Sequence, residues 1–305
     1  MVYTGQQANK MSNYHIRPDG LIGHIIDSTN MVQEFVGTDK EELWAQNKLK
    51  VASQFTDHTK FLDVQHYLKT PVTYRYNEHG HRNNDTIQDI NLLTKPYILV
   101  IGDSFTEGTG LAVEETYAQQ LKEITGLDVY NLGLGGTGID VMLHNLVIWS
   151  TIAVNPPAMV VCQWSDINRS MEMYSATANP NTLSKHQQLV GSNHLSEPIP
   201  MKKYWIEHFL HAGNELNFYN SRAVIAEIQI KKLYQKSKIV NVVLPGWQVN
   251  EQIITTWTLN NKIWWTPTPD KQWLTARYKL DYARDLQHKG RVANSWLAQE
   301  IVKYF

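Results

Sequence analysis

Short apolar runs alternate with amphipathic stretches along most of this chain from residue 95 onward. The apolar runs are four to six residues long and cover 97–101, 127–132, 159–163, 239–244 and 262–265. Stretches with helical periodicity lie between and after them, at 113–125, 139–152, 202–211, 220–236 and 291–304. Strands separated by helices predict a mostly parallel sheet that helices cover on both faces. The fold class is therefore α/β.

Two of the predicted helices have a clear buried face. In the stretch 113–125, Tyr117, Leu121 and Ile124 share one face, and Gly126 supplies a stop signal. The closing stretch 291–304 carries an apolar stripe of Ala293, Trp296, Leu297, Ile301 and Val302. Both helices are expected to pack on the sheet.

Two parts of the chain do not follow the alternation. Residues 1–94 are polar with short apolar patches, and we interpret them as an N-terminal extension or accessory region that precedes a domain over 95–305. Within it, 40–52 has a weak helical pattern, and 72–76 alternates like a strand before the turn signal at 77–80. We interpret residues from about 170 to 235 as an insertion, whose first thirty residues are rich in Ser, Asn and Pro and look irregular.

Composition excludes several classes of protein. The 305 residues carry a formal net charge of −1 without a basic stripe, so we expect no nucleic-acid partner. No apolar run approaches the roughly 20 residues of a membrane span, and the first ten residues lack the apolar stretch of a signal peptide. The single cysteine, Cys162, rules out an intrachain disulfide. We expect a soluble chain without a membrane partner.

The first candidate for chemistry is Ser104. The predicted strand at 97–101 runs directly into the sequence G-D-S-F at 102–105. A serine between a strand and a helix lies near free backbone N–H groups, which stabilise developing negative charge. A turn serine or a helix cap explains the same pattern equally well.

A glycine-rich loop follows the second predicted strand, with the sequence N-L-G-L-G-G-T-G at 131–138. Glycines let the backbone approach a ligand closely. The spacing G-x-G-x-x-G of a dinucleotide site does occur in it. However, the loop follows the second strand and lacks the acidic residue that binds ribose, which disfavours that interpretation.

A carboxylate and an imidazole lie near the end of the chain, at Asp285 and His288. Their three-residue spacing puts both side chains on one side of a single turn. Asp285 can then orient the imidazole while its other nitrogen faces Ser104, as in a Ser-His-Asp relay for acyl transfer.

Together these three segments resemble the SGNH (GDSL-like) hydrolases over about 95–305. The resemblance implies a flavodoxin-like three-layer fold and cofactor-free ester hydrolysis. It makes Ser104 the nucleophile, Asp285 and His288 its partners, and the N–H groups of Ser104 and Gly136 oxyanion donors. A weaker match at 76–82 resembles the stretch N-S-x-G-F-R that precedes the domain in relatives, with His81 in place of the aromatic residue.

One block departs from this family pattern. Ser165 stands where the family's oxyanion-hole asparagine is expected, within Q-W-S-D-I-N at 163–168. Removing one such donor typically lowers the rate by about 10²–10³. Ser165 through its hydroxyl, or Asn168 from nearby, is the candidate replacement. A hole made of the Ser104 and Gly136 N–H groups alone is the remaining alternative.

A histidine pair and a group of tryptophans are two further candidate binding sites. His79 and His81 form an H-x-H pair, but no further ligands with zinc-like spacing accompany it, so we expect no metal. Four tryptophans precede the Asp285 turn, at positions 257, 264, 265 and 273. They suit either a carbohydrate cleft or packing between the insertion and the sheet.

The sequence therefore predicts a serine ester hydrolase. By resemblance, it removes O-acetyl or other short acyl groups from a glycan or another small ester, with no cofactor. Two alternatives stay open, an acetyltransferase of the same fold and a catalytically degenerate carbohydrate-binding or structural module. The resemblance is compatible with a cytoplasmic location and with a virion-associated one, and the sequence does not indicate an oligomeric state.

Overall fold

The computed structural model describes most of the predicted α/β domain and part of what precedes it. The described residues are 14–26, 31–34, 72–83, 85–92, 95–165, 169–175, 188–194, 215–244, 261–265, 283–285 and 288–305. The helices predicted over 40–52 and 202–211 lie outside them. None of the described helices combines the length and the apolar character needed to cross a membrane.

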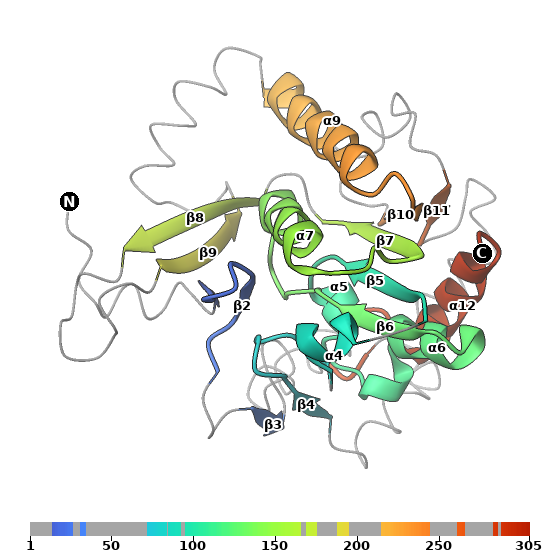
Figure 1. Ribbon diagram of the computed structural model, residues 1–305. Helices are drawn as coiled ribbons and strands as arrows, with labels where there is room; N and C mark the ends of the chain where they lie inside the picture. Colours follow the sequence, from blue (N-terminus) through green and yellow to red (C-terminus); the bar gives the residue numbers. More distant parts are fainter. Residues whose placement is uncertain are drawn as a thin grey trace, which may run out of the picture.

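A five-stranded sheet forms the centre of the molecule, and all of its pairings are parallel (Figure 1). Its strands are β5 (Tyr97–Ile101), β6 (Asp128–Asn131), β7 (Met159–Trp164), β10 (Lys238–Val243) and β11 (Lys262–Trp264). Their spatial order is β11-β10-β7-β5-β6. Read from β6, this is the flavodoxin-like order 2-1-3-4-5, whose switch point lies between β5 and β7. The predicted strands are confirmed.

Helices cover both faces of this sheet. On one face pack α4 (Ile87–Asn91), α7 (Ile139–Ile152) and α9 (Glu215–Leu233), with Trp149 of α7 fully buried. On the other pack α6 (Tyr117–Thr125) and α12 (Arg291–Val302), with Leu121 and Leu297 fully buried. Figure 1 shows the resulting three layers. The predicted three-layer α/β fold is confirmed.

Two helices begin at other residues than the sequence predicts. The stretch 113–125 begins as a separate 3₁₀ turn, η3 (Val113–Glu115), because the side chain of Thr116 accepts a hydrogen bond from the N–H of Gln119 and so starts α6 there. Ile124 is 48 % exposed, so it does not share the buried face. Gly126 ends α6 with a φ of +68°, as predicted. Helix α9 begins five residues earlier than the predicted start at 220.

Two described segments in the first part of the predicted insertion are strands, where the sequence predicts irregular structure. Residues Arg169–Ser175 form β8 and Gln188–His194 form β9, which pair antiparallel. Strands β1 (Tyr14–Ile16) and β2 (Ile22–His24) complete a second sheet in the order β2-β1-β9-β8. Local sequence could not indicate these strands, because β9 pairs with a strand more than 170 residues earlier in the chain.

The described residues between 14 and 92, here called the N-terminal region, contact the α/β domain closely. Strand β3 (Val32–Glu34) pairs with β4 (Thr73–Arg75), within the stretch predicted as a strand. Buried Arg82 donates to the carbonyl oxygens of Gly108 at 2.6 Å and Leu111 at 2.6 Å. His81 Nε2 donates to the carbonyl of Ile22 at 2.9 Å. The division of the chain at residue 94 stays a prediction.

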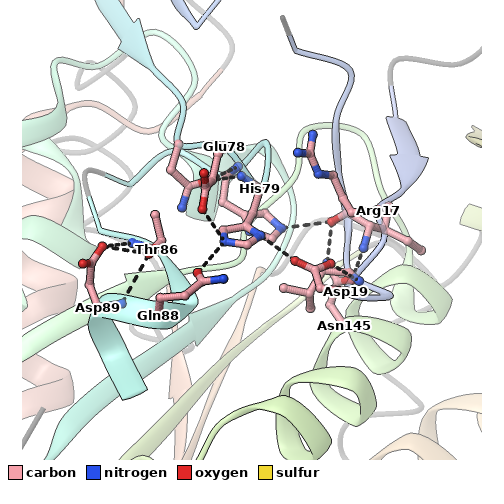
Figure 2. Close-up of polar contacts among 12 residues, drawn as sticks. Arg17, Asp19, Glu78, His79, Thr86, Gln88, Asp89 and Asn145 are labelled. Atoms are coloured by element: carbon pink, nitrogen blue, oxygen red, sulfur yellow. Dashed lines mark hydrogen bonds and ion pairs between the residues drawn. The ribbon is translucent and has the colours of Figure 1, made fainter. Parts of the chain in front are cut away.

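A charged contact joins two loops of the N-terminal region (Figure 2). His79 Nδ1 lies 2.5 Å from Asp19 Oδ2, and its Nε2 donates to Gln88 Oε1 at 3.3 Å. Hydrogen bonding to Asp19 raises the pKa of His79 against the opposing effect of burial. The loop that carries Asp19 is thereby fastened to the turn at 77–80 and to α4.

Candidate active site

Ser104 lies at the carboxyl end of β5, at the switch point of the sheet. Strand β5 is buried along its whole length and leads through Gly102 into the short helix α5 (Ser104–Glu107). The Asp103 side chain caps this helix by accepting a hydrogen bond from the N–H of Phe105 at 3.0 Å. A side chain at position 102 would come within 2.1 Å of Thr106 Oγ1, which explains the glycine there. Such switch points are where ligands bind in open parallel sheets.

Asp285 and His288, which the sequence predicts as partners of Ser104, both lie beside it in the structure. His288 Nδ1–H donates to Asp285 Oδ2 at 2.5 Å, and Ser104 Oγ–H donates to His288 Nε2 at 2.6 Å. The Asp285 carboxylate also accepts the His288 backbone N–H at 3.0 Å, which fixes the turn. Gly110 admits this turn, since its φ is +78° and a Cβ there would lie 2.9 Å from Ala283 Cβ.

Carboxylates around His288 control its charge. Burial acts to lower the pKa of His288, but the charge and hydrogen bond of Asp285 outweigh it, and Asp103 and Glu107 add to that effect. The net effect raises the pKa of His288 above its ordinary value. The surroundings therefore favour the imidazolium that forms when His288 accepts a proton from Ser104.

The glycine-rich loop lies beside the end of β5. Asn131 Nδ2 donates to the carbonyl of Thr106 at 2.8 Å, and its Oδ1 accepts the N–H of Gly133 at 2.8 Å, so this side chain joins the loop to α5. A Cβ at Gly133 would come within 2.6 Å of the Glu107 nitrogen. Gly136 has a φ of +75° and is exposed, so conformation rather than space requires glycine there.

The structure describes only one of the two predicted replacements for the missing asparagine, Ser165. Ser165 is fully buried, and its hydroxyl group lies 2.5 Å from the Thr137 carbonyl and 3.1 Å from Asp103 Oδ2. Its one hydrogen is therefore directed at these internal acceptors. Asn168 lies outside the described residues. The oxyanion role of Ser165 stays a prediction.

Sequence reasoning missed Arg169, the first residue of β8. Its NH1 group lies 3.0 Å from Asp103 Oδ2, 3.4 Å from the Thr137 carbonyl and 3.4 Å from Ser165 Oγ. Burial raises the pKa of Asp103 in spite of the Arg169 charge, which acts to lower it. No sequence signal marked this arginine, because it lies in a segment that looked irregular.

Glu107 and His24 were also missed. His24 Nε2 donates to Glu107 Oε1 at 2.7 Å, and the hydroxyl of Tyr76 donates to the same oxygen at 3.0 Å. A Cβ at Gly135 would lie 2.7 Å from Glu107 Oε2 and 3.6 Å from Ser104 Cβ, so the carboxylate lies next to the glycine-rich loop. Burial opposes the charged form, but His24 and Arg82 outweigh it and lower the pKa of Glu107. Residues of the N-terminal region thus stabilise the negative charge that Glu107 of α5 places near the candidate triad.

Of the other predicted binding residues, His81 and Trp265 make structural contacts. His81 is fully buried, and burial lowers its pKa to about 4, so it is neutral near pH 7. No group of three metal-binding side chains occurs within the described part of the chain. Trp265 is buried against Phe105 and Tyr117 and therefore belongs to the core. Trp257, Trp273 and the side chain of Trp264 lie outside the described part of the structure.

Comparisons with known proteins found distant structural similarity. No family model matches the sequence, and no curated protein matches it. A lipolytic protein of the G-D-S-L family from Veillonella parvula is 14 % identical, with 69 % of this chain and 98 % of that chain covered and a TM-score of 0.41. A carbohydrate esterase family 2 enzyme with a carbohydrate binding domain from Corynascus thermopiles (Myceliophthora fergusii) is 13 % identical, with 76 % of this chain and 74 % of that chain covered and a TM-score of 0.41. An acetyl xylan esterase from the rumen bacterium Butyrivibrio proteoclasticus is 12 % identical, with 70 % of this chain and 64 % of that chain covered and a TM-score of 0.37. At these identities and TM-scores, the substrates of those proteins do not carry over to this chain.

Proposed function

We propose that this protein is a serine ester hydrolase that works through an acyl-enzyme. The observation that carries the proposal is the continuous chain of hydrogen bonds from Asp285 through His288 to Ser104, 2.5 and 2.6 Å long. It lies at the carboxyl end of β5, where a parallel sheet presents its functional groups. Nucleophile, base and orienting carboxylate are within hydrogen-bond reach of one another, which is the geometry this chemistry needs.

Acylation begins when Ser104 Oγ attacks the ester carbonyl carbon. The Ser104 proton passes to His288 Nε2, and Asp285 stabilises the imidazolium through Nδ1–H. The carbonyl oxygen becomes an oxyanion, for which the N–H groups of Ser104 and Gly136 are the proposed donors. The imidazolium then returns its proton to the alkoxide as the carbon–oxygen bond breaks, and the alcohol leaves.

Deacylation repeats these steps with water. His288 removes a proton from the water, whose oxygen attacks the acyl carbon, and the proton returns to Ser104 as the acid leaves. The proton transfers and the bonds broken and formed balance over the cycle with no cofactor.

The proposed substrate is a short acyl ester of a polar alcohol, such as an O-acetylated carbohydrate. The resemblance of the motifs at 102–105, 131–136 and 285–288 implies ester hydrolysis. The partly exposed side chains here are polar in His24, Arg169 and His288 but apolar in Phe105, whose ring packs against that of His288, so they do not select the alcohol. The proposed substrate class rests on the resemblance.

The experiment is hydrolysis of p-nitrophenyl esters of increasing acyl length by the wild type and by Ser104→Ala. We expect turnover by the wild type, fastest with acetate, and loss of turnover in the variant. Glu300→Gln, which removes a carboxylate from a surface pair with Lys303 on α12, is the matched control and should hydrolyse the esters like the wild type. Equal background rates in the wild type and Ser104→Ala would contradict hydrolysis. Product formation only after a sugar acceptor is added would indicate acyl transfer instead.

A further inference from the structure

The guanidinium of Arg169 lies beside Ser165, the residue that stands where the family resemblance predicts the oxyanion-hole asparagine. Arg169 NH1 contacts Asp103 Oδ2, which precedes the nucleophile in the chain, and the carbonyl of Thr137, which follows Gly136. It also lies 3.4 Å from Ser165 Oγ, at the position where the asparagine was expected. Arg169 therefore touches the neighbours of both proposed oxyanion donors.

Ser165 and Arg169 differ in how deeply their side chains are buried. Ser165 and Asp103 are fully buried, whereas 12 % of the Arg169 side chain is exposed. The serine hydroxyl thus lies beneath, and of these three side chains only that of Arg169 is partly exposed. A guanidinium has five N–H donors in a planar fork, so one group can serve several acceptors at once.

The backbone holds Arg169 in this place. A Cβ at Gly138 would come within 2.6 Å of the Arg169 carbonyl oxygen and 2.9 Å of Arg169 Cβ, so the start of β8 packs directly on the end of the glycine-rich loop. Strand β8 is paired along its length with β9. The guanidinium therefore extends from a paired strand to Asp103, beyond the carboxyl end of β5.

We propose that Arg169 replaces the missing asparagine as the third donor to the oxyanion of the tetrahedral intermediate. This inference rests on the proposed function and assigns a further catalytic residue to it. A charged donor forms a stronger hydrogen bond to an oxyanion than a neutral amide does. Its ion pair with Asp103 orients the guanidinium before substrate binds.

A rival explanation is that Arg169 serves only as the counter-ion of buried Asp103. Arg169→Met alone cannot separate the two roles, because it removes a donor and also leaves a buried carboxylate without its cation. Asp103→Asn removes that carboxylate and keeps an acceptor for the N–H of Phe105. The effect of Arg169→Met in the Asp103→Asn background therefore isolates the direct role, as in a double-mutant cycle.

The experiment measures the rate of covalent inactivation by diisopropyl fluorophosphate, which requires no knowledge of the natural ester. Ser104 Oγ forms the bond to phosphorus, fluoride leaves, and His288 takes the serine proton. The phosphoryl oxygen gains charge in the oxyanion hole. Arg169→Met should slow inactivation by about 10²–10³-fold in the wild-type background and by a similar factor in the Asp103→Asn background. Arg75→Met, which removes an exposed arginine from β4, should inactivate at the wild-type rate.

Equal rates for Asp103→Asn and Asp103→Asn/Arg169→Met would overturn the inference and leave the proposed function intact. Absence of any label on wild-type Ser104 would overturn the proposed function, and this inference with it. Thermal melts of the four proteins check that the compared variants are folded. The Asp103→Asn pair keeps the test valid even if Arg169→Met alone does not fold.

Discussion

The candidate triad and the N-terminal region both meet α5, but they serve it in different ways. The candidate triad joins α5 through Ser104, its first residue, and through His288, whose ring lies 4.6 Å from that of Phe105. In the proposed reaction, its groups are the ones whose protons move. The N-terminal region holds the far end of α5, where Arg82 donates to the carbonyls of Glu107 and Gly108 and where Tyr76 and His24 hold the Glu107 carboxylate. The residues proposed for the reaction and the residues that stabilise α5 are therefore separate groups, and they can be changed independently. Changes in the triad should alter rate, whereas changes in the N-terminal region should alter stability first.

The largest effect is expected on the triad side. Asp285→Asn keeps the shape of the turn but no longer fixes the His288 tautomer or stabilises the imidazolium, so kcat should fall by about 10⁴-fold. The midpoint of urea unfolding should stay close to that of the wild type. Steady-state ester hydrolysis and urea titration measure the two quantities. A variant that keeps wild-type kcat, or that loses activity only by unfolding, would break the comparison.

The second largest effect is expected on the support side. Arg82→Met removes the donor to the buried carbonyl of Leu111 and one of two donors to that of Gly108, and it removes the stacking of the guanidinium on the Tyr74 ring. The free energy of unfolding should fall by about 3 kcal/mol or more. Urea unfolding measures it, with exposed Arg75→Met as the matched control. Equal stability of the two variants would show that the N-terminal region is not a support.

A smaller, pH-dependent effect is expected from His79→Gln. The pKa of His79 is raised and that of Asp19 is lowered in the folded protein. The His79 contribution is therefore fully present below about pH 6.5 and is lost as pH rises through the folded pKa of His79. The Asp19 contribution is present above about pH 3.9 and is lost as pH falls through the folded pKa of Asp19.

Unfolding at a series of pH values tests this contact. The stability difference between wild type and His79→Gln should be largest between these limits and should shrink at alkaline pH. A difference that does not change with pH would mean that the charge of His79 plays no part in fastening the loop of Asp19.

Glu107→Gln should give the smallest effect, and it sharpens the comparison because Glu107 belongs to both sides. The charge of Glu107 raises the pKa of His288, and only neutral His288 can act as the base. Removing that charge should lower the pKa of His288 and move the acid limb of the kcat/KM profile to lower pH. The wild-type limb itself should lie above about pH 6.5. Glu300→Gln is the control, and an unmoved limb in Glu107→Gln would show that Glu107 acts only on stability.

The central sheet and the proximity of Ser104, His288 and Asp285 could be predicted because their signals are local. Strand β5 and the turn of Asp285 and His288 each lie within a few residues of sequence, and hydrophobic periodicity indicates α7 and α12 directly. The register of the sheet then brings the carboxyl ends of its strands together. Ser104 and His288 meet for this reason, although 184 residues separate them.

The supports could not be predicted because they depend on contacts between distant segments. Arg169, which contacts Asp103, lies on β8, and β8 pairs with β9, which pairs with β1. His24 reaches Glu107 across 83 residues. The segment around Arg169 looked irregular because polar strands that pair at a distance have no strong period of their own. Ser165 was expected as an oxyanion donor from its position alone, and only side-chain geometry shows its hydroxyl directed at internal acceptors.

The most direct test of the account is to trap the acyl-enzyme. Wild-type protein is mixed with p-nitrophenyl acetate, quenched in acid during turnover, and digested for mass spectrometry. The account predicts one acetyl group on the peptide that contains Ser104, and none on that peptide from Ser104→Ala. Ester hydrolysis without a Ser104 adduct, or an acetyl group at the same level on another residue in both proteins, would contradict it.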